Sequence, residues 1–303
     1  MVRYEEGLAV ASVPVGCESH PIQSPTKKST WPQLSQAFPL FLPVSLIESR
    51  LSKDLLLMHG IESLKTRIRN GDRVVGASVR MWATQSDVDR TLSFADYDFL
   101  AVDAQHSPFS EENLVNICEI ANDMGVPIQL RIKHTRLTFL IGNMLDLGPS
   151  LIEVPQVENL GTVQDALDNF YYPQRGRRSW GPSRSPQTGL YPDRHEYAEW
   201  WNSHGILWMQ LESVLGVTRA REMADLGVDV LSWGPNDLAF NREANPDHAL
   251  KTDDDCVEHV ISSLKGSDGT LCLRTYSDAQ LGRYSDMGVT MFLDESNLFT
   301  EPR

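Results

Sequence analysis

Short runs of apolar residues alternate with longer amphipathic segments from about residue 74 to residue 293. The short runs are typical of buried parallel strands, and the longer segments are typical of helices that cover a sheet. The alternation predicts strands over residues 74–80, 98–103, 128–131, 151–155, 207–211, 228–233, 270–274 and 289–293. Helices are predicted between them, over residues 87–94, 110–125, 137–147, 163–171, 217–224, 254–264 and 279–286.

These elements form eight strand-helix units, of which the last keeps only residues 297–303 for a helix that is predicted to be cut short. Eight parallel units in about 240 residues favour a closed TIM-type (β/α)₈ barrel over an open doubly wound sheet. No GxGxxG follows the first strand, which argues against a dinucleotide-binding fold. Residues 173–204 interrupt the alternation and are predicted to form a long irregular loop.

The first 57 residues show neither the two-residue period of a strand nor the 3.6-residue period of a helix, and they are rich in serine and proline. They offer too little patterned apolar surface to offset the entropy of ordering, so we expect a disordered extension. The alternative is that residues 1–57 are not native coding sequence and that Met58 is the true start. The expected organisation is this extension followed by the barrel over residues 58–303.

Composition narrows the range of functions. The 303 residues include 41 acidic and 27 basic ones, which gives a net charge of −14. A surface this acidic repels phosphate backbones and anionic membranes, so we expect neither nucleic acid nor a membrane as a partner. The four cysteines show no CxxC spacing, which argues against thiolate metal clusters and a disulfide framework. No apolar run approaches the roughly 20 residues that span a bilayer, and we expect a cytoplasmic protein.

Reactive groups in a (β/α)₈ barrel lie at the carboxyl ends of the strands. Polar residues that end or follow the predicted strands are therefore the candidates for chemistry. They are Arg80, Asp103, Gln105, His106, Arg131, Gln210, Glu212, Asn236 and Asp237.

Glu212 and Asp237 are the natural metal pair in this set. Two carboxylates with water and a chelating substrate suit Mg²⁺ or Mn²⁺, and the lack of a His/Cys ligand cluster argues against a structural zinc. The alternative is that each carboxylate caps a helix or pairs with a lysine. For two strand ends that face one mouth, the metal interpretation is favoured.

Asp103 and His106 suggest a general base, because an imidazole oriented by a carboxylate titrates near neutral pH. Arg131 could hold a developing enolate oxygen, with a salt bridge between strand ends as a serious alternative. The arginines of the long loop could bind a substrate anion or contact another subunit; they are Arg175, Arg177, Arg178, Arg184 and Arg194. Structural roles are expected for the other histidines, which are His20, His59, His134, His195, His204, His248 and His259.

The blocks around these residues carry a family resemblance. From about Glu62 to Leu293 the chain resembles the HpcH/HpaI family of metal-dependent 2-oxo-acid (pyruvate) aldolases, such as 2,4-dihydroxyhept-2-ene-1,7-dioate aldolase and 2-keto-3-deoxy sugar-acid aldolases. No single block is decisive, but their order and spacing are specific. The blocks are Asp103-Ala104-Gln105-His106-Ser107-Pro108, Arg131, Val154-Pro155-Gln156-Val157-Glu158, Tyr172-Pro173 through Arg178, Gln210-Leu211-Glu212 and Gly234-Pro235-Asn236-Asp237-Leu238.

The resemblance implies a barrel of the phosphoenolpyruvate/pyruvate-binding type and a lyase that splits a 4-hydroxy-2-oxo acid into pyruvate and an aldehyde. Glu212 and Asp237 would hold a divalent metal, Mg²⁺ before Mn²⁺ or Co²⁺, which chelates the 2-oxo acid. Arg131 would steady the oxygen of a metal-bound enolate, and His106, oriented by Asp103, would move the proton through water. Substrate contacts would come from Gln210 and from the backbone amides around Gly234, Pro235, Asn236 and Asp237.

Three departures from the family pattern stand out. Gln105 occupies a position where the family usually has glutamate. Arg80 stands where glycine is common, and its positive charge could demand a second acidic function on the substrate. The short last helix would, in the family, pack on a partner subunit, commonly within a hexamer, and a homo-oligomer is expected here as well.

Two other functions stay open at this point. A relative that resembles macrophomate synthase would decarboxylate oxaloacetate, and it would use the same enolate. A catalytically silent barrel scaffold would account for Gln105 and the short last helix, although both metal carboxylates, His106 and Arg131 weigh against it.

Overall fold

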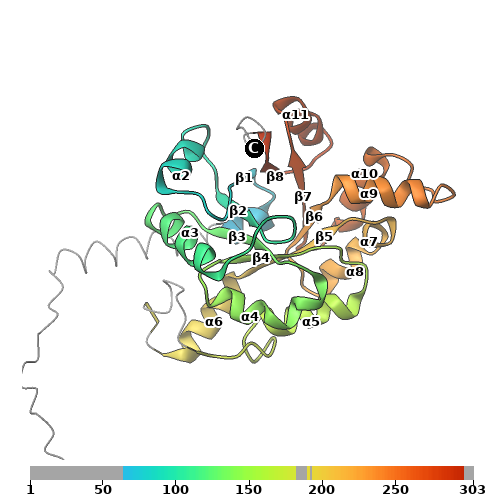
Figure 1. Cartoon of the computed structure of the whole chain (residues 1–303). Helices are drawn as coiled ribbons and strands as arrows, with labels where there is room; N and C mark the ends of the chain where they lie inside the picture. The colour runs from blue at the N-terminus through green and yellow to red at the C-terminus, as the bar shows by residue number, and fades with distance from the viewer. Residues whose placement is uncertain (1–63, 182–189, 192, 297–303) are drawn as a thin grey trace, which may run out of the picture. The chain divides into compact units, whose positions relative to one another are not determined.

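The computed structural model describes residues 64–181, 190–191 and 193–296. In this part of the chain, eight parallel strands close into a barrel in the order β1 to β8, and helices surround it (Figure 1). The predicted TIM-type barrel is therefore confirmed. The extension predicted for residues 1–57 and the short helix predicted for residues 297–303 lie outside the described residues.

All eight predicted strands form, with bounds that shift by a few residues at most. Each pairs with its neighbours in parallel, and β8 pairs with β1 to close the sheet. The strands are β1 (Val74–Ser78), β2 (Phe99–Asp103), β3 (Ile128–Arg131), β4 (Leu151–Val154), β5 (Ile206–Leu211), β6 (Val230–Trp233), β7 (Thr270–Thr275) and β8 (Met291–Asp294).

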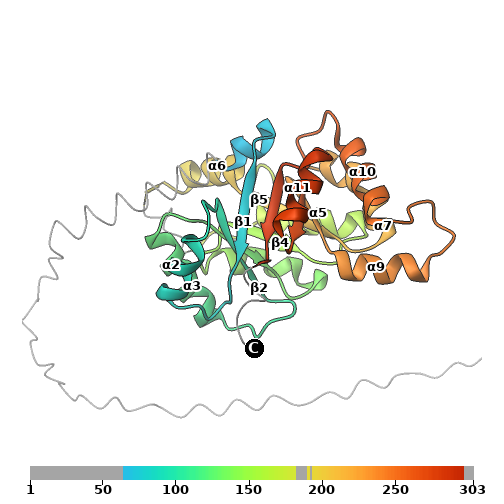
Figure 2. The same ribbon diagram turned by 90° about the horizontal axis from the view of Figure 1, so that it is seen from above.

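The helices pack outside the strands, as the views in Figures 1 and 2 show. A further helical segment over residues 64–70 precedes β1. Within the described ranges, no helix is long and apolar enough to span a membrane. The helices are α2 (Gln85–Leu92), α3 (Glu111–Asp123), η1 (Thr135–Leu140, a 3₁₀ helix), α4 (Ile141–Leu145), α5 (Leu160–Phe170), α6 (Arg194–His204), α7 (Val214–Thr218), α8 (Ala220–Asp225), α9 (Pro235–Ala244), α10 (Asp253–Leu264) and α11 (Asp278–Asp286).

Two of these helices were not predicted. The helix α6 lies inside the segment predicted to be irregular, where the Asp193 side chain caps its first amides and the aromatic residues Tyr197, Trp200 and Trp201 anchor it in the core. The helix α9 buries only Leu238. A single buried residue leaves no apolar period in the sequence, so pattern alone could not reveal this helix.

The core has two parts, and alternate residues of each strand belong to different parts. On β2, Leu100 and Val102 face the cluster that includes the surrounding helices, whereas Phe99 and Ala101 belong to a second cluster made mostly of strand residues. The second cluster fills the lumen of the barrel, where the rings of Phe99 and Trp208 pack edge to face with centroids 5.4 Å apart. Gly76 is required here, because a Cβ atom on it would lie 2.2 Å from the Phe99 ring.

Candidate active site

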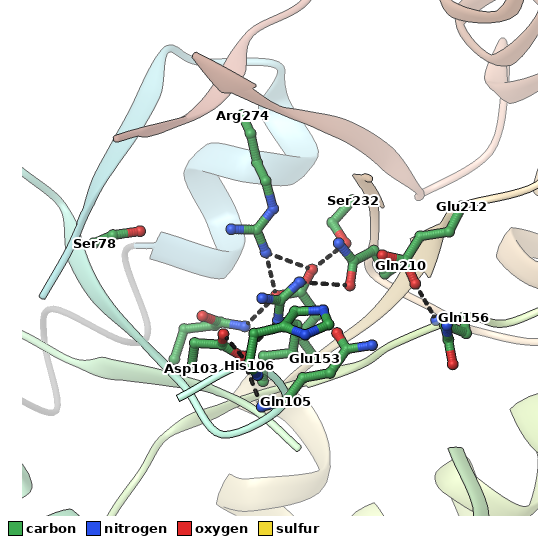
Figure 3. Close-up of polar contacts among 12 residues, drawn as sticks. Ser78, Asp103, Gln105, His106, Glu153, Gln156, Gln210, Glu212, Ser232 and Arg274 are labelled. Carbon is green, nitrogen blue, oxygen red and sulfur yellow. Dashed lines mark hydrogen bonds and ion pairs between the residues drawn. The ribbon is translucent and has the colours of Figure 1, made fainter. Parts of the chain in front are cut away.

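The lumen changes from apolar to polar along the strands. Each strand presents every second residue to the lumen, so the positions that follow Phe99 and Ala101 on β2 lead to Asp103. On β7 the same step leads from Cys272 to Arg274, and on β4 it leads from Leu151 to Glu153. The carboxyl ends of the strands therefore converge on polar and charged side chains, which Figure 3 shows. The apolar cluster of the lumen lies further toward the amino ends of the strands.

Arg131 joins two of the predicted site residues. Its Nε atom donates to Asp103 Oδ1 over 2.8 Å, and its Nη1 atom donates to Gln210 Oε1 over 3.2 Å. Burial alone would raise the pKa of Asp103, but the bonds from Arg131 and from backbone amides hold that pKa below its ordinary value. The salt bridge that the sequence left as an alternative for Arg131 is therefore present, and Gln210 places the same guanidinium beside β5.

The predicted pairing of Asp103 with the His106 imidazole is not what the structure shows. The Asp103 carboxylate accepts the backbone amides of Gln105 and His106, over 2.8 and 3.1 Å, in addition to Arg131. These bonds turn the chain sharply after β2 and occupy both carboxylate oxygens. His106 is exposed beside this turn (Figure 3). The turn positions its backbone, and the imidazole is not oriented by Asp103.

Glu212 and Asp237 line one pocket of 510 Å³ at the carboxyl face. Glu212 is 6% exposed, and its Oε2 atom accepts a hydrogen bond from the backbone N–H of Gln156 over 2.8 Å. Burial first, and then the negative charges of Asp237 and Glu153, raise the pKa of Glu212 to about 7, against the opposing charge of Arg131. The two carboxylates therefore repel each other in a partly dry site, which is the situation that a bound cation relieves.

The chain between β6 and α9 is shaped by its approach to Glu212. A Cβ atom on Gly234 would lie 2.3 Å from Glu212 Cγ and 2.7 Å from Oε1, so only glycine fits. The Gly234 amide already donates to Leu211 O over 3.0 Å, and Pro235 has no amide hydrogen. The predicted backbone contact with the substrate therefore cannot come from an N–H group of Gly234 or Pro235. In this turn, the amides of Asn236 and Asp237 remain as candidates.

A buried polar layer lies beneath the site, and its residues were not among the predicted site residues. Glu153 is fully buried and accepts hydrogen bonds from Gln129 (2.8 Å) and Ser232. Arg274 reaches across the lumen to the same carboxylate, with Nη2–Oε distances of 3.2 and 3.0 Å, as Figure 3 shows. Its Nη1 atom donates to Glu295 Oε1 over 2.6 Å. The alternation along the strands was the available signal, because Gln129 stands two residues before Arg131 on β3.

Arg80 lies two residues beyond β1, at a second pocket of 220 Å³. This pocket also has Asp103 and Arg131 in its wall, and the polar layer with Glu153 and Arg274 in its lining. The structure thus places Arg80, Asp103 and Arg131 at one pocket and Glu212 with Asp237 at the other. Arg131 and Gln210 connect the two.

The donor set fits a hard divalent cation. Among the described residues, no group of three or more His, Cys, Asp or Glu side chains is arranged to hold a metal ion. Two carboxylates beside an open pocket do suit Mg²⁺ or Mn²⁺, because these ions commonly keep several waters or take oxygens from a substrate. The residues present therefore fit a divalent ion whose remaining coordination positions are filled by water or by the substrate.

The arginines of the segment after α5 make contacts within the chain. Arg178 is buried, pairs with Asp146 over 2.8 Å and lies 4.7 Å from the Tyr172 ring centroid. Arg177 pairs with Asp168, and Arg175 stacks on the Tyr171 ring. These three side chains hold the segment against α5 and α6. Arg184 lies outside the described residues, and Arg194 begins α6.

The chain is similar to known proteins in sequence and in fold. The family described as HpcH/HpaI aldolase/citrate lyase matches residues 78–260, which is more than half of the chain. A hydroxypyruvate/pyruvate aldolase of Roseovarius nubinhibens is 24% identical over 230 residues, covering 75% of this chain and 87% of the relative. An HpcH/HpaI aldolase structure from Desulfitobacterium hafniense shares the fold with a TM-score of 0.65 at 23% identity, over 77% of this chain and 89% of that one. The structure of macrophomate synthase shares it with a TM-score of 0.61 at 18% identity, over 78% and 83%.

Proposed function

Because the chain belongs to the HpcH/HpaI aldolase/citrate lyase family, we propose that it cleaves a 4-hydroxy-2-oxo acid to pyruvate and an aldehyde. Membership in this family makes the chain an enzyme of the carbon–carbon lyase class, and its relatives carry aldolase names. The specific substrate and the metal requirement are the parts that we propose.

The observation that carries the proposal is the pair of Glu212 and Asp237 beside Arg131. The two carboxylates share a pocket, and the charges of Asp237 and Arg131 both act on Glu212. A 2-oxo acid offers its 2-oxo oxygen and one carboxylate oxygen to a divalent cation. The same 2-oxo oxygen can also accept a hydrogen bond from a guanidinium. These carboxylates and this guanidinium match those requirements.

A divalent cation held by Glu212 and Asp237 would supply Lewis-acid stabilisation of negative charge when the C3–C4 bond breaks. Arg131 faces the oxygen on which the electron pair of that bond comes to rest, and its planar fork is fixed by Asp103 and Gln210. The C4 hydroxyl loses its proton as the aldehyde leaves, and C3 gains a proton to become the pyruvate methyl. His106, exposed at the turn after β2, exchanges these protons through water.

The test is pyruvate release from a panel of 4-hydroxy-2-oxo acids, measured with Mg²⁺, Mn²⁺ or Co²⁺ after removal of bound metal. We expect release that depends on the added ion and is lost in Asp237→Asn, while the unfolding transition of the variant stays cooperative. Oxaloacetate is included in the panel, because CO₂ release from it without cleavage of any hydroxy-oxo acid would favour decarboxylation instead. If the enzyme turns over none of the acids in the panel, the proposal is contradicted.

We also propose that the chain forms a homo-oligomer. Sedimentation velocity of the full-length protein tests this, and a purely monomeric species would contradict it.

A further inference from the structure

Three charged side chains of the lumen take no part in the mechanism above. Arg274 on β7 donates through Nη2 to both oxygens of Glu153 on β4, over 3.2 and 3.0 Å, as Figure 3 shows. Through Nη1 it donates to Glu295, which follows β8, over 2.6 Å. We call these three residues the charged triad. Because two carboxylates share one guanidinium, the triad has one negative charge in excess.

The charged triad is shielded from water. Glu153 is fully buried, and the side chains of Arg274 and Glu295 are 10% and 13% exposed. Burial would lower the pKa of Arg274, but the charges of Glu153 and Glu295 hold that pKa above its ordinary value, so the guanidinium stays ionised. Water and salt screen buried charges much less than surface charges, so the excess charge of the triad acts on its surroundings over several ångströms.

The nearest part of the site on which this charge can act is the carboxylate pair. Ser232 on β6 donates to Glu153, and Ser232 lies in register with Gln210 on β5, two residues before Glu212. On β4, the backbone N–H of Gln156, three residues after Glu153, donates to Glu212. Besides burial and the neighbouring carboxylate, the charge of Glu153 raises the pKa of Glu212. The triad therefore lies within electrostatic reach of Glu212.

The triad carboxylates contribute charge to this region, and they are not placed as ligands. Glu153 already accepts hydrogen bonds from Gln129, Ser232 and Arg274. Glu295 likewise accepts hydrogen bonds from its neighbours. A negative charge near two ligating carboxylates favours a cation there without touching it.

We propose that the charged triad sets the affinity of the site for its divalent cation, because Glu153 and Glu295 add negative charge beneath the ion and Arg274 offsets part of it. The three are positioning residues, since they act on the ion through space and contact neither it nor the substrate. The inference rests on the proposed function, because it assumes that Glu212 and Asp237 hold the ion.

The experiment measures the dissociation constant of Mg²⁺ by calorimetry on chelator-treated protein, without substrate. Glu153→Gln and Glu295→Gln each remove the excess negative charge of the triad. The double variant Glu153→Gln/Arg274→Met removes the buried ion pair and leaves Glu295, so the excess of one negative charge returns. The matched control is Gln129→Met, which removes a neutral hydrogen bond to the same Glu153 carboxylate and no charge. Cooperative unfolding of each variant confirms that it folds.

We expect Glu153→Gln and Glu295→Gln each to raise the Mg²⁺ dissociation constant about tenfold, whereas Gln129→Met stays within about twofold of wild type. The double variant should return to within about threefold of wild type, because its charge balance is restored. A merely structural role predicts the opposite, since a second buried substitution adds damage to the first.

Unchanged affinity in Glu153→Gln and Glu295→Gln, or a double variant that binds Mg²⁺ no better than Glu153→Gln, would overturn the inference. If Glu153→Gln does not fold, the less buried Glu295→Gln decides the result, and wild-type affinity in that variant overturns the inference. A wild-type protein that does not bind Mg²⁺ would instead overturn the metal requirement of the proposed function.

Discussion

The substitution Glu212→Gln should stabilise the protein when no metal is present, even though it should abolish activity. In the folded chain, burial and the charge of Asp237 raise the pKa of Glu212 from 4.5 to about 7. At about 1.4 kcal/mol for each pKa unit, the ionised carboxylate costs at most about 3.5 kcal/mol of folding free energy. The glutamine side chain keeps the shape of glutamate and an oxygen that accepts from the backbone N–H of Gln156. Because its own NH₂ group needs a hydrogen-bond partner, we expect the unfolding free energy to rise by only about 1–3 kcal/mol.

The pH dependence gives the sign of this effect. Below the unfolded pKa, the carboxyl group of Glu212 is protonated in both states and costs nothing. As the pH rises from 4.5 to about 7, the unfolded chain releases the proton before the folded chain does, so the penalty grows and is complete above about 7. The difference in unfolding free energy between variant and wild type should therefore be below about 1 kcal/mol near pH 5 and largest near pH 8.

Denaturant unfolding of the chelator-treated proteins at both pH values measures this difference. The matched control is Glu258→Gln on the exposed face of α10, which should show no such dependence. Saturating Mg²⁺ should then reverse the order, because an ion at about one thousand times its dissociation constant adds about 4.1 kcal/mol to the wild type alone. A Glu212→Gln variant no more stable than wild type at pH 8 without metal would show that the ionised Glu212 carboxylate does not destabilise the metal-free protein.

Three further predictions concern the same site. Arg131→Lys should lower turnover by on the order of 100-fold with the fold intact, because an ammonium group cannot copy the planar fork; steady-state kinetics and circular dichroism check this, and a wild-type rate would remove Arg131 from the chemistry. Gly234→Ala should weaken Mg²⁺ binding by on the order of tenfold, since its Cβ would displace Glu212. Calorimetry measures this change against Gly282→Ala, whose Cβ would meet nothing within 4 Å; equal affinities would argue against the approach to Glu212. His106→Ala should slow solvent exchange of the pyruvate methyl protons, as followed by NMR, and an unchanged exchange rate would exclude His106 from proton transfer.

The fold could be predicted from the sequence because its strands are short apolar runs between amphipathic helices. That pattern gave all eight strands, but it could not give α9, whose one buried residue is Leu238. It also treated each strand as uniformly buried. The separation of lumen from outer face within β4, which puts Glu153 in the lumen, depends on the register of a closed barrel.

The residues of the candidate site could be predicted where they directly follow a predicted strand. Residues that lie just past a strand, such as Glu212 and Asp237, gather at the carboxyl face whatever the loops do. The partner of Asp103 was not predictable, because it depends on which of two nearby groups reaches the carboxylate. Arg131 reaches it from the neighbouring strand, in direct register with Asp103. That contact and the turn amides leave the His106 ring outside.

Metal dependence of cleavage is tested by pyruvate release from chelator-treated enzyme, before and after Mg²⁺ is added back, in wild type and Asp237→Asn. We expect no release from either protein without metal, recovery in the wild type on addition of Mg²⁺, and no recovery in the variant at the same concentration. Undiminished turnover after thorough chelation, or full recovery in Asp237→Asn, would contradict the claim that Glu212 and Asp237 hold the ion on which cleavage depends.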